Sequence, residues 1–172
     1  MRNKALSLSA AAVLCALTIG TLAGCGTIVG VSAGDGVSIP EGKATVKTTG
    51  AASQTVDSGA TVHAKANAPV ALTLNKANAN VICDDSTSEI DIQGFSGTVT
   101  VSGACNVVNI SGLGATVNLG AVQDITVEGA NNKVDVDSAE TLSVAGLTNK
   151  VTYGKITTIG HVTGIDNSTR AR

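Results

Sequence analysis

Apolar and polar residues alternate in short stretches that recur every 17 or 18 residues between residues 72 and 153. Each repeat holds two such stretches, and this period of two is typical of a β-strand with one buried face. Reading equivalent positions down the repeats gives four apolar columns of five residues each. They are Leu72, Ile90, Val108, Ile125 and Leu142; Leu74, Ile92, Ile110, Val127 and Val144; Val81, Val99, Val117, Val134 and Val151; and Cys83, Val101, Leu119, Val136 and Tyr153.

Two folds fit these columns. In a β-solenoid each repeat is one coil, and like positions stack about 4.8 Å apart. In an antiparallel β-meander or sandwich, the segments between the strands are hairpin turns, and glycine follows the first strand in four of the repeats, as at Gly129 and Gly146. Equal spacing on both strands favours parallel, in-register stacking. The sequence therefore predicts an all-β fold, a β-solenoid of five to six 17–18-residue coils with two short strands each.

The columns also set the expected boundaries of this repeat domain, residues 54–165. Val56 and Val62 indicate one imperfect coil upstream, and Val162 and Gly164 begin a truncated last coil. Residues 166–172 are polar and are expected to form a C-terminal cap or tail. Residues 25–53 lack the columns and are rich in glycine, so a flexible tether is expected there.

The N-terminal segment predicts export and lipidation. Arg2 and Lys4 precede an apolar run that ends in Leu-Ala-Gly-Cys at residues 22–25, so residues 1–24 are expected to be a signal peptide. This ending resembles the bacterial lipobox, in which the cysteine receives a diacylglycerol and becomes the new N-terminus. An ordinary secretory signal and a retained membrane helix are the alternatives. A lipid on Cys25 would anchor the chain to the extracytoplasmic side of the cell membrane.

Two cysteines remain once Cys15 leaves with the leader and Cys25 carries lipid. Exported domains commonly pair their cysteines, so a disulfide between Cys83 and Cys105 is expected. Two free thiols or a metal site are the alternatives. In a solenoid both cysteines would lie at one corner of adjacent turns, within reach of a disulfide.

Composition limits the partners. Without residues 1–24 the chain keeps nine basic residues against 13 acidic ones, and no basic patch predicts a nucleic-acid partner. Phe95 and Tyr153 are the only aromatic residues, which excludes stacking platforms for bases or sugars. The outward columns carry hydroxyl and amide groups that could contact envelope polysaccharide or protein. No cofactor is expected.

Few residues suggest a catalytic or metal-binding site. Asp84, Asp85, Glu89 and Asp91 form the densest acidic cluster, which could hold Ca²⁺ or simply be a solvated corner. The Gly-x-Ser-x-Gly pattern at residues 30–34 has no strand-to-helix context, and His63 and His161 lie at opposite ends of the repeats. The chain is therefore not expected to be an enzyme. A calcium-dependent or hydrolytic domain similar to a β-roll, using the acidic cluster, is the alternative.

The lipobox, the tether, the paired cysteines and the repeated core, seen at residues 125–134, resemble an uncharacterised lipoprotein family common in actinobacteria and catalogued as a domain of unknown function. The resemblance covers about residues 70–165. It implies a cell-envelope location and a β-rich repeat domain, and it transfers no catalytic residues. Gly97 and Ala115 stand where Asn132 and Asn149 lie later, so an asparagine ladder is expected only in the C-terminal coils. The expected function is a cell-envelope lipoprotein with a non-catalytic β-repeat module for binding or spacing.

Overall fold

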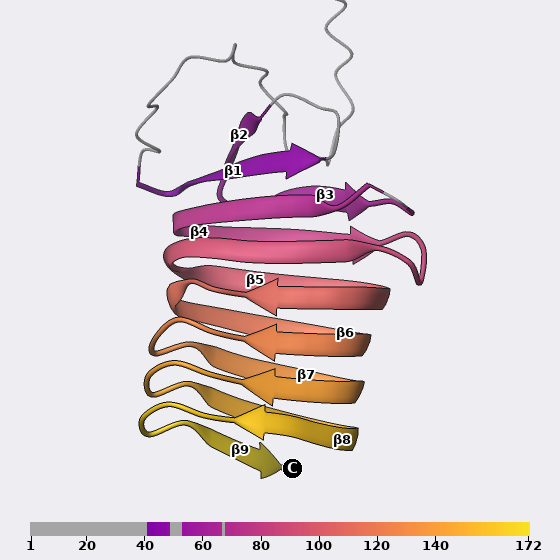
Figure 1. Cartoon of the computed structure of the whole chain (residues 1–172). Helices are drawn as coiled ribbons and strands as arrows, with labels where there is room; N and C mark the ends of the chain where they lie inside the picture. The colour runs from indigo at the N-terminus through magenta and orange to yellow at the C-terminus, as the bar shows by residue number, and fades with distance from the viewer. Residues whose placement is uncertain (1–40, 49–52, 67) are drawn as a thin grey trace, which may run out of the picture.

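The computed structural model describes residues 41–48, 53–66 and 68–172, and within these ranges it contains nine β-strands and no helix (Figure 1). No helix in the described part of the chain could therefore cross a membrane. The strands are β1 (Lys43–Thr48), β2 (Gln54–Asp57), β3 (Ala60–Ala64), β4 (Val70–Cys83), β5 (Glu89–Ile110), β6 (Leu113–Val127), β7 (Lys133–Val144), β8 (Lys150–Val162) and β9 (Ser168–Ala171).

Strands β4 to β9 stack in chain order, and every neighbouring pair is parallel. A meander needs antiparallel neighbours, so the prediction of a β-solenoid is confirmed, with about six turns of about 18 residues. Several of the labelled strands bend through a corner and so run along two faces of the coil, as the curved ribbons in Figure 1 show. The stack places equivalent residues of successive coils directly above one another.

The register of the first coil differs from the predicted columns. Val70, not Leu72, lies beside Ile90, and Val81 lies beside Val101, so these strands are offset by 20 residues. The predicted third column is confirmed from Val99 onward through residues 117, 134 and 151. A loop over residues 84–88 accounts for the longer first step, because it adds residues that the later coils lack.

The N-terminal end of the stack is covered by strands that break the pattern. β1 runs antiparallel to β4 and pairs on its other side with β2, while β3 lies parallel to β4. Ala44 and Val46 point inward from β1 and are buried. The folded domain therefore starts within residues 25–53, a range that was expected to be a tether. The short strand β1 pairs with β4 and so covers the open end of the sheet.

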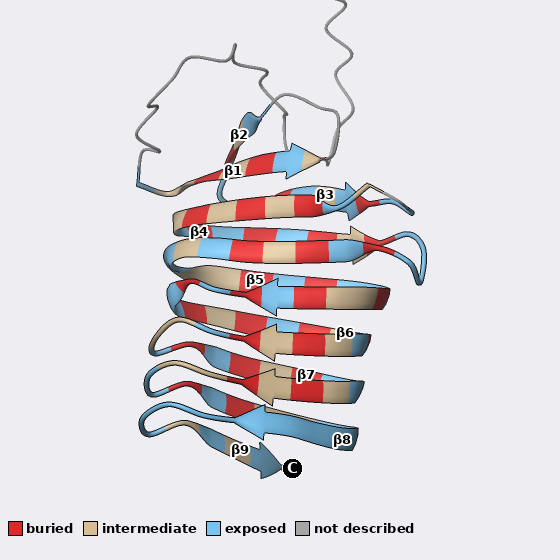
Figure 2. Cartoon of the chain, viewed as in Figure 1, coloured by how far each residue is buried: buried red, intermediate tan, exposed pale blue. Residues whose placement is uncertain are grey.

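The opposite end carries one further strand. Residues 166–172 were expected to form a cap or tail, and they contain β9, which pairs with the start of β8. No described strand lies beyond this coil, so its inward side chains Ile159 and Val162 stay 43% and 44% exposed (Figure 2). Between the two ends, the inward columns make one continuous apolar core in which Leu72, Val117 and Leu142 are fully buried.

Asparagine side chains tie together the last three turns along one edge. Asn132, Asn149 and Asn167 stack in register, and the Oδ1 of each accepts the backbone N–H of the residue in the preceding coil, at 2.8–3.0 Å. The Nδ2 groups donate to backbone carbonyls of the bends. The expected restriction of the ladder to the C-terminal coils is confirmed, and Asn167 extends it by one turn. The carbonyls of the bend glycines thereby gain a second donor beside the backbone N–H of the next coil, and the carbonyls of Glu128, Ala145 and Thr163 also gain a donor.

Gly146 offers a sharp test of this close stacking. A Cβ at Gly146 would lie 2.1 Å from the backbone oxygen of Gly129 in the coil before, and the residue has a φ of +96°. Gly59 has a similar φ of +89°, but no atom lies within 4 Å of its Cβ position. We expect Gly146→Ala to lower the free energy of unfolding by more than about 3 kcal/mol, since it combines a backbone collision with φ strain.

The matched change Gly59→Ala carries the φ strain alone, which costs about 1 kcal/mol. Denaturant unfolding of both variants measures the difference. Equal losses for the two variants would mean that the coils are not packed this closely at Gly146.

Candidate functional site

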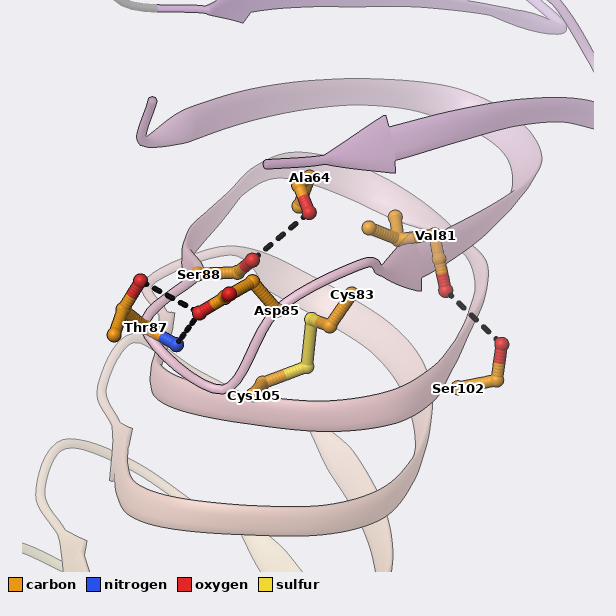
Figure 3. Close-up of a disulfide and its surroundings, with 8 residues drawn as sticks. All are labelled: Ala64, Val81, Cys83, Asp85, Thr87, Ser88, Ser102 and Cys105. Carbon is orange, nitrogen blue, oxygen red and sulfur yellow. Dashed lines mark hydrogen bonds between the residues drawn. A yellow bond between two sulfur atoms is a disulfide. The ribbon is translucent and has the colours of Figure 1, made fainter. Parts of the chain in front are cut away.

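The corner between the first two coils holds the disulfide (Figure 3). Cys83 ends β4, Cys105 lies within β5, and their Cα atoms are 5.5 Å apart in the bonded pair. Both cysteines are buried. The predicted pairing is confirmed, although Cys83 lies beside Gly103 rather than Val101 because of the shifted register. The bond fastens the coil with the longest insertion to its neighbour.

The disulfide closes a segment with a sequence separation of 22 residues. On the chain-entropy account, such a crosslink stabilises the fold by about 3 kcal/mol. We expect the double change Cys83→Ser and Cys105→Ser to lower the free energy of unfolding by this amount, and so to move the denaturation midpoint to a lower denaturant concentration. Reductant added to the unchanged chain should lower the midpoint in the same way. A midpoint that neither treatment moves would show that the bond adds nothing to stability.

The loop between these strands is organised by its own side chains. The Asp85 carboxylate accepts hydrogen bonds from the backbone N–H and the hydroxyl of Thr87, both at 2.8 Å, and these bonds hold the Asp85 pKa below its usual range (Figure 3). Ser88 is fully buried, and its hydroxyl donates to the Ala64 carbonyl at 2.8 Å. The Ser88 carbonyl in turn accepts the Asn106 N–H. The loop is thus fixed to the coils on both sides.

The four acidic candidates do not share one site. Asp84 Oδ1 lies 2.9 Å from His63 Nδ1, and Asp91 accepts a hydrogen bond from Gln93. The Asp85 carboxylate accepts its hydrogen bonds from Thr87, and Glu89 is the first residue of β5. Across the described residues, no group of three or more His, Cys, Asp or Glu side chains could hold a metal ion. The geometry gives the calcium alternative no ligand set.

A shallow hollow of about 410 Å³ lies on an outer face of the solenoid. Arg172 folds back across two coils at its edge, and its guanidinium lies 3.0 Å from carboxylate oxygens of both Asp135 and Asp137. It also donates to the Val136 carbonyl at 2.8 Å. Thr100 and Asn118, among others, line the rest of the hollow. The hollow is a shelf of mixed character: it offers hydroxyl, amide and partly neutralised carboxylate groups beside the apolar surface of Val101 and Leu119.

Sequence reasoning missed two of these residues. Ser88 carried no pattern, because one serine in a polar loop gives no sign of its burial. Arg172 was counted only as part of a polar tail, and nothing in the chain predicts that it reaches back to Asp137. His161 is exposed and lies far along the stack from His63, as expected. Cys25 and the Gly-x-Ser-x-Gly pattern at residues 30–34 lie outside the described residues.

The fold and its surfaces define a class of protein, a short disulfide-stapled β-solenoid with polar outer faces. A family described as a protein of unknown function (DUF3060) matches residues 92–141 and 110–161. The two matches start 18 residues apart, which is one turn of the solenoid, so the chain resembles this family in two registers of the same repeat. No curated protein and no solved structure matches the chain.

Proposed function

We propose that this chain is a cell-envelope lipoprotein, held by a lipid on Cys25 at the extracytoplasmic side of the cell membrane. Its solenoid acts there as a non-catalytic module for binding or spacing. The proposal of a binding or spacing module rests on the regular stacking of the coils in the solenoid. Its inward columns form a continuous core, and its outward columns present hydroxyl and amide groups over several coils.

The polar groups of the described coils support binding more than catalysis. Three of the four acidic side chains near the disulfide, Asp84, Asp85 and Asp91, each have a separate partner. The buried Ser88 hydroxyl donates to a backbone carbonyl. Nucleophilic catalysis needs a base beside an accessible hydroxyl or thiol. The outer shelf between Thr100 and Arg172 suits neutral polar partners, so envelope polysaccharide or protein is the proposed class of ligand.

Anchoring rests on the sequence at residues 22–25. A lipid with two acyl chains is sufficient for stable membrane attachment, whereas one chain is marginal. We expect Cys25→Ala to move the exported protein from the membrane fraction to the soluble fraction or the medium. Immunoblotting of the fractions measures this, and metabolic labelling with a fatty acid should mark the unchanged chain but not Cys25→Ala.

Cys15→Ala is the matched control, because it removes a thiol ten residues upstream, outside the lipobox. This variant should stay in the membrane fraction and keep the lipid label. Retention of Cys25→Ala in the membrane, at the level of the control, would contradict the lipid anchor.

A further inference from the structure

A ridge of apolar side chains runs along one edge of the solenoid. It consists of the residue after the bend glycine in five successive coils, which pair in register: Phe95, Leu113, Ala130, Leu147 and Ile165. The four large members are 45–62% exposed. Four steps of strand spacing make the ridge about 19 Å long. Exposed apolar residues are common singly, whereas a continuous row of this kind marks a contact surface.

The order of side chains along the ridge is nearly symmetric. Ala130 stands at the centre, a leucine lies one coil away on each side, and the large Phe95 and Ile165 lie at the two ends. A surface that pairs with itself across a two-fold axis must meet its own reverse order. We propose that this ridge is the contact between two copies of the chain, which run antiparallel with the axis at Ala130.

The sizes of the side chains suit this arrangement. Two twisted stacks that cross face to face approach most closely at one point, and the smallest ridge residue occupies it. Leu113 then meets the partner's Leu147, and Phe95 meets the partner's Ile165. Each apolar side chain is therefore covered by another of similar bulk.

Charges beside the ridge favour the same orientation. The column next to it begins with Lys76 and ends with Asp166, both in the left-handed region of φ. Lys76 forms an exposed ion pair with Glu41 of its own chain, at 3.1 Å. Reversal of the second copy brings this lysine near the partner's Asp166 as well, about one coil away and within reach of a lysine side chain. A parallel pair would set like charges level with one another.

The area sets the strength of the contact. Four half-exposed large side chains offer on the order of 400 Å² per copy, about half of what a standard interface buries on each partner. The two Glu128 side chains, which lie close to the axis, oppose it further. The pairing is therefore transient and needs a high local concentration of the chain, which the lipid anchor of the proposed function supplies.

Cysteine crosslinking in intact cells tests the axis. Full-length chains with one added cysteine are treated with diamide and separated on non-reducing gels, beside the unchanged chain as baseline. Only a residue at a two-fold axis faces itself, so Ala130→Cys should give about tenfold more dimer than the exposed control Asn118→Cys. Leu113→Cys and Leu147→Cys should each give little dimer alone and a mixed dimer when expressed together.

Three outcomes would overturn the proposal. Ala130→Cys and the mixed leucine pair could both remain at the level of Asn118→Cys, which is also the result expected if a membrane or another protein covers the ridge. Leu113→Cys and Leu147→Cys could each dimerise alone as well as Ala130→Cys, which indicates a parallel or random contact. Ile159→Cys could give the strongest dimer, which indicates end-to-end stacking instead.

Discussion

Val134→Asp should unfold the repeat domain, whereas an aspartate placed on the outer face should be tolerated. Val134 is 1% exposed and lies between Val117 and Val151 of the neighbouring coils. An aspartate there would be buried without a partner, and burying an unpaired charge costs several kcal/mol. Because small domains have only about 5–15 kcal/mol of stability in total, we expect loss of cooperative unfolding at room temperature.

Thr100→Asp is the matched control, since it adds the same side chain to an exposed strand position beside Asn80 and Asn118. It should change the free energy of unfolding by less than about 1 kcal/mol. Circular dichroism during denaturant titration measures both variants. Similar stability for the two would refute the assignment of inward and outward columns.

Asn149→Ala should produce the second large loss of stability. Asn149 is fully buried, its Oδ1 accepts the Asn132 N–H, and its Nδ2 donates to the carbonyls of Gly129 and Ala145. Alanine leaves the Asn132 N–H and the Ala145 carbonyl without these partners, while the Gly129 carbonyl still accepts the Leu147 N–H. At 1–3 kcal/mol for each of the two groups, we expect a loss of about 2–5 kcal/mol.

Asn118→Ala removes the same side chain from an exposed position on the outer face and should stay within about 0.5 kcal/mol of the unchanged chain. Hydrogen exchange adds a local measurement. In Asn149→Ala the Asn132 amide should lose protection first, because its acceptor is gone. An Asn132 amide that stays protected would show that the ladder adds little to the bend.

The core and the parallel stack could be predicted because β-branched residues recur in register. Val99, Val117, Val134 and Val151 are both a sequence column and a physical stack. The register of the first coil could not be predicted in the same way. Val70, Leu72 and Leu74 alternate with polar or small residues, so a slip by two keeps the same face inward, and the pattern alone fits either register.

The disulfide could be predicted because only two cysteines remain in the exported domain. The strand β1, the apolar ridge and the partners of the acidic residues could not be predicted. β1 holds only two buried residues, which is too short an alternation to separate from a tether. The ridge contributes one residue per coil, inside bends where the strand pattern stops. The predicted acidic cluster does not form one site, because His63, Thr87 and Gln93 each interact with a different carboxylate.

A distance between two spin labels tests the stacked coils most directly. Thr98 and Ser168 belong to one column, joined through residues 116, 133 and 150, so four strand spacings separate them. The solenoid predicts a backbone separation of about 19 Å. The measured label-to-label distances should form a single narrow distribution around this value, shifted only by the length of the label arms. A meander would place these residues eight strands apart, about 38 Å. A measured distance near the longer value would contradict the parallel stack on which the whole account depends.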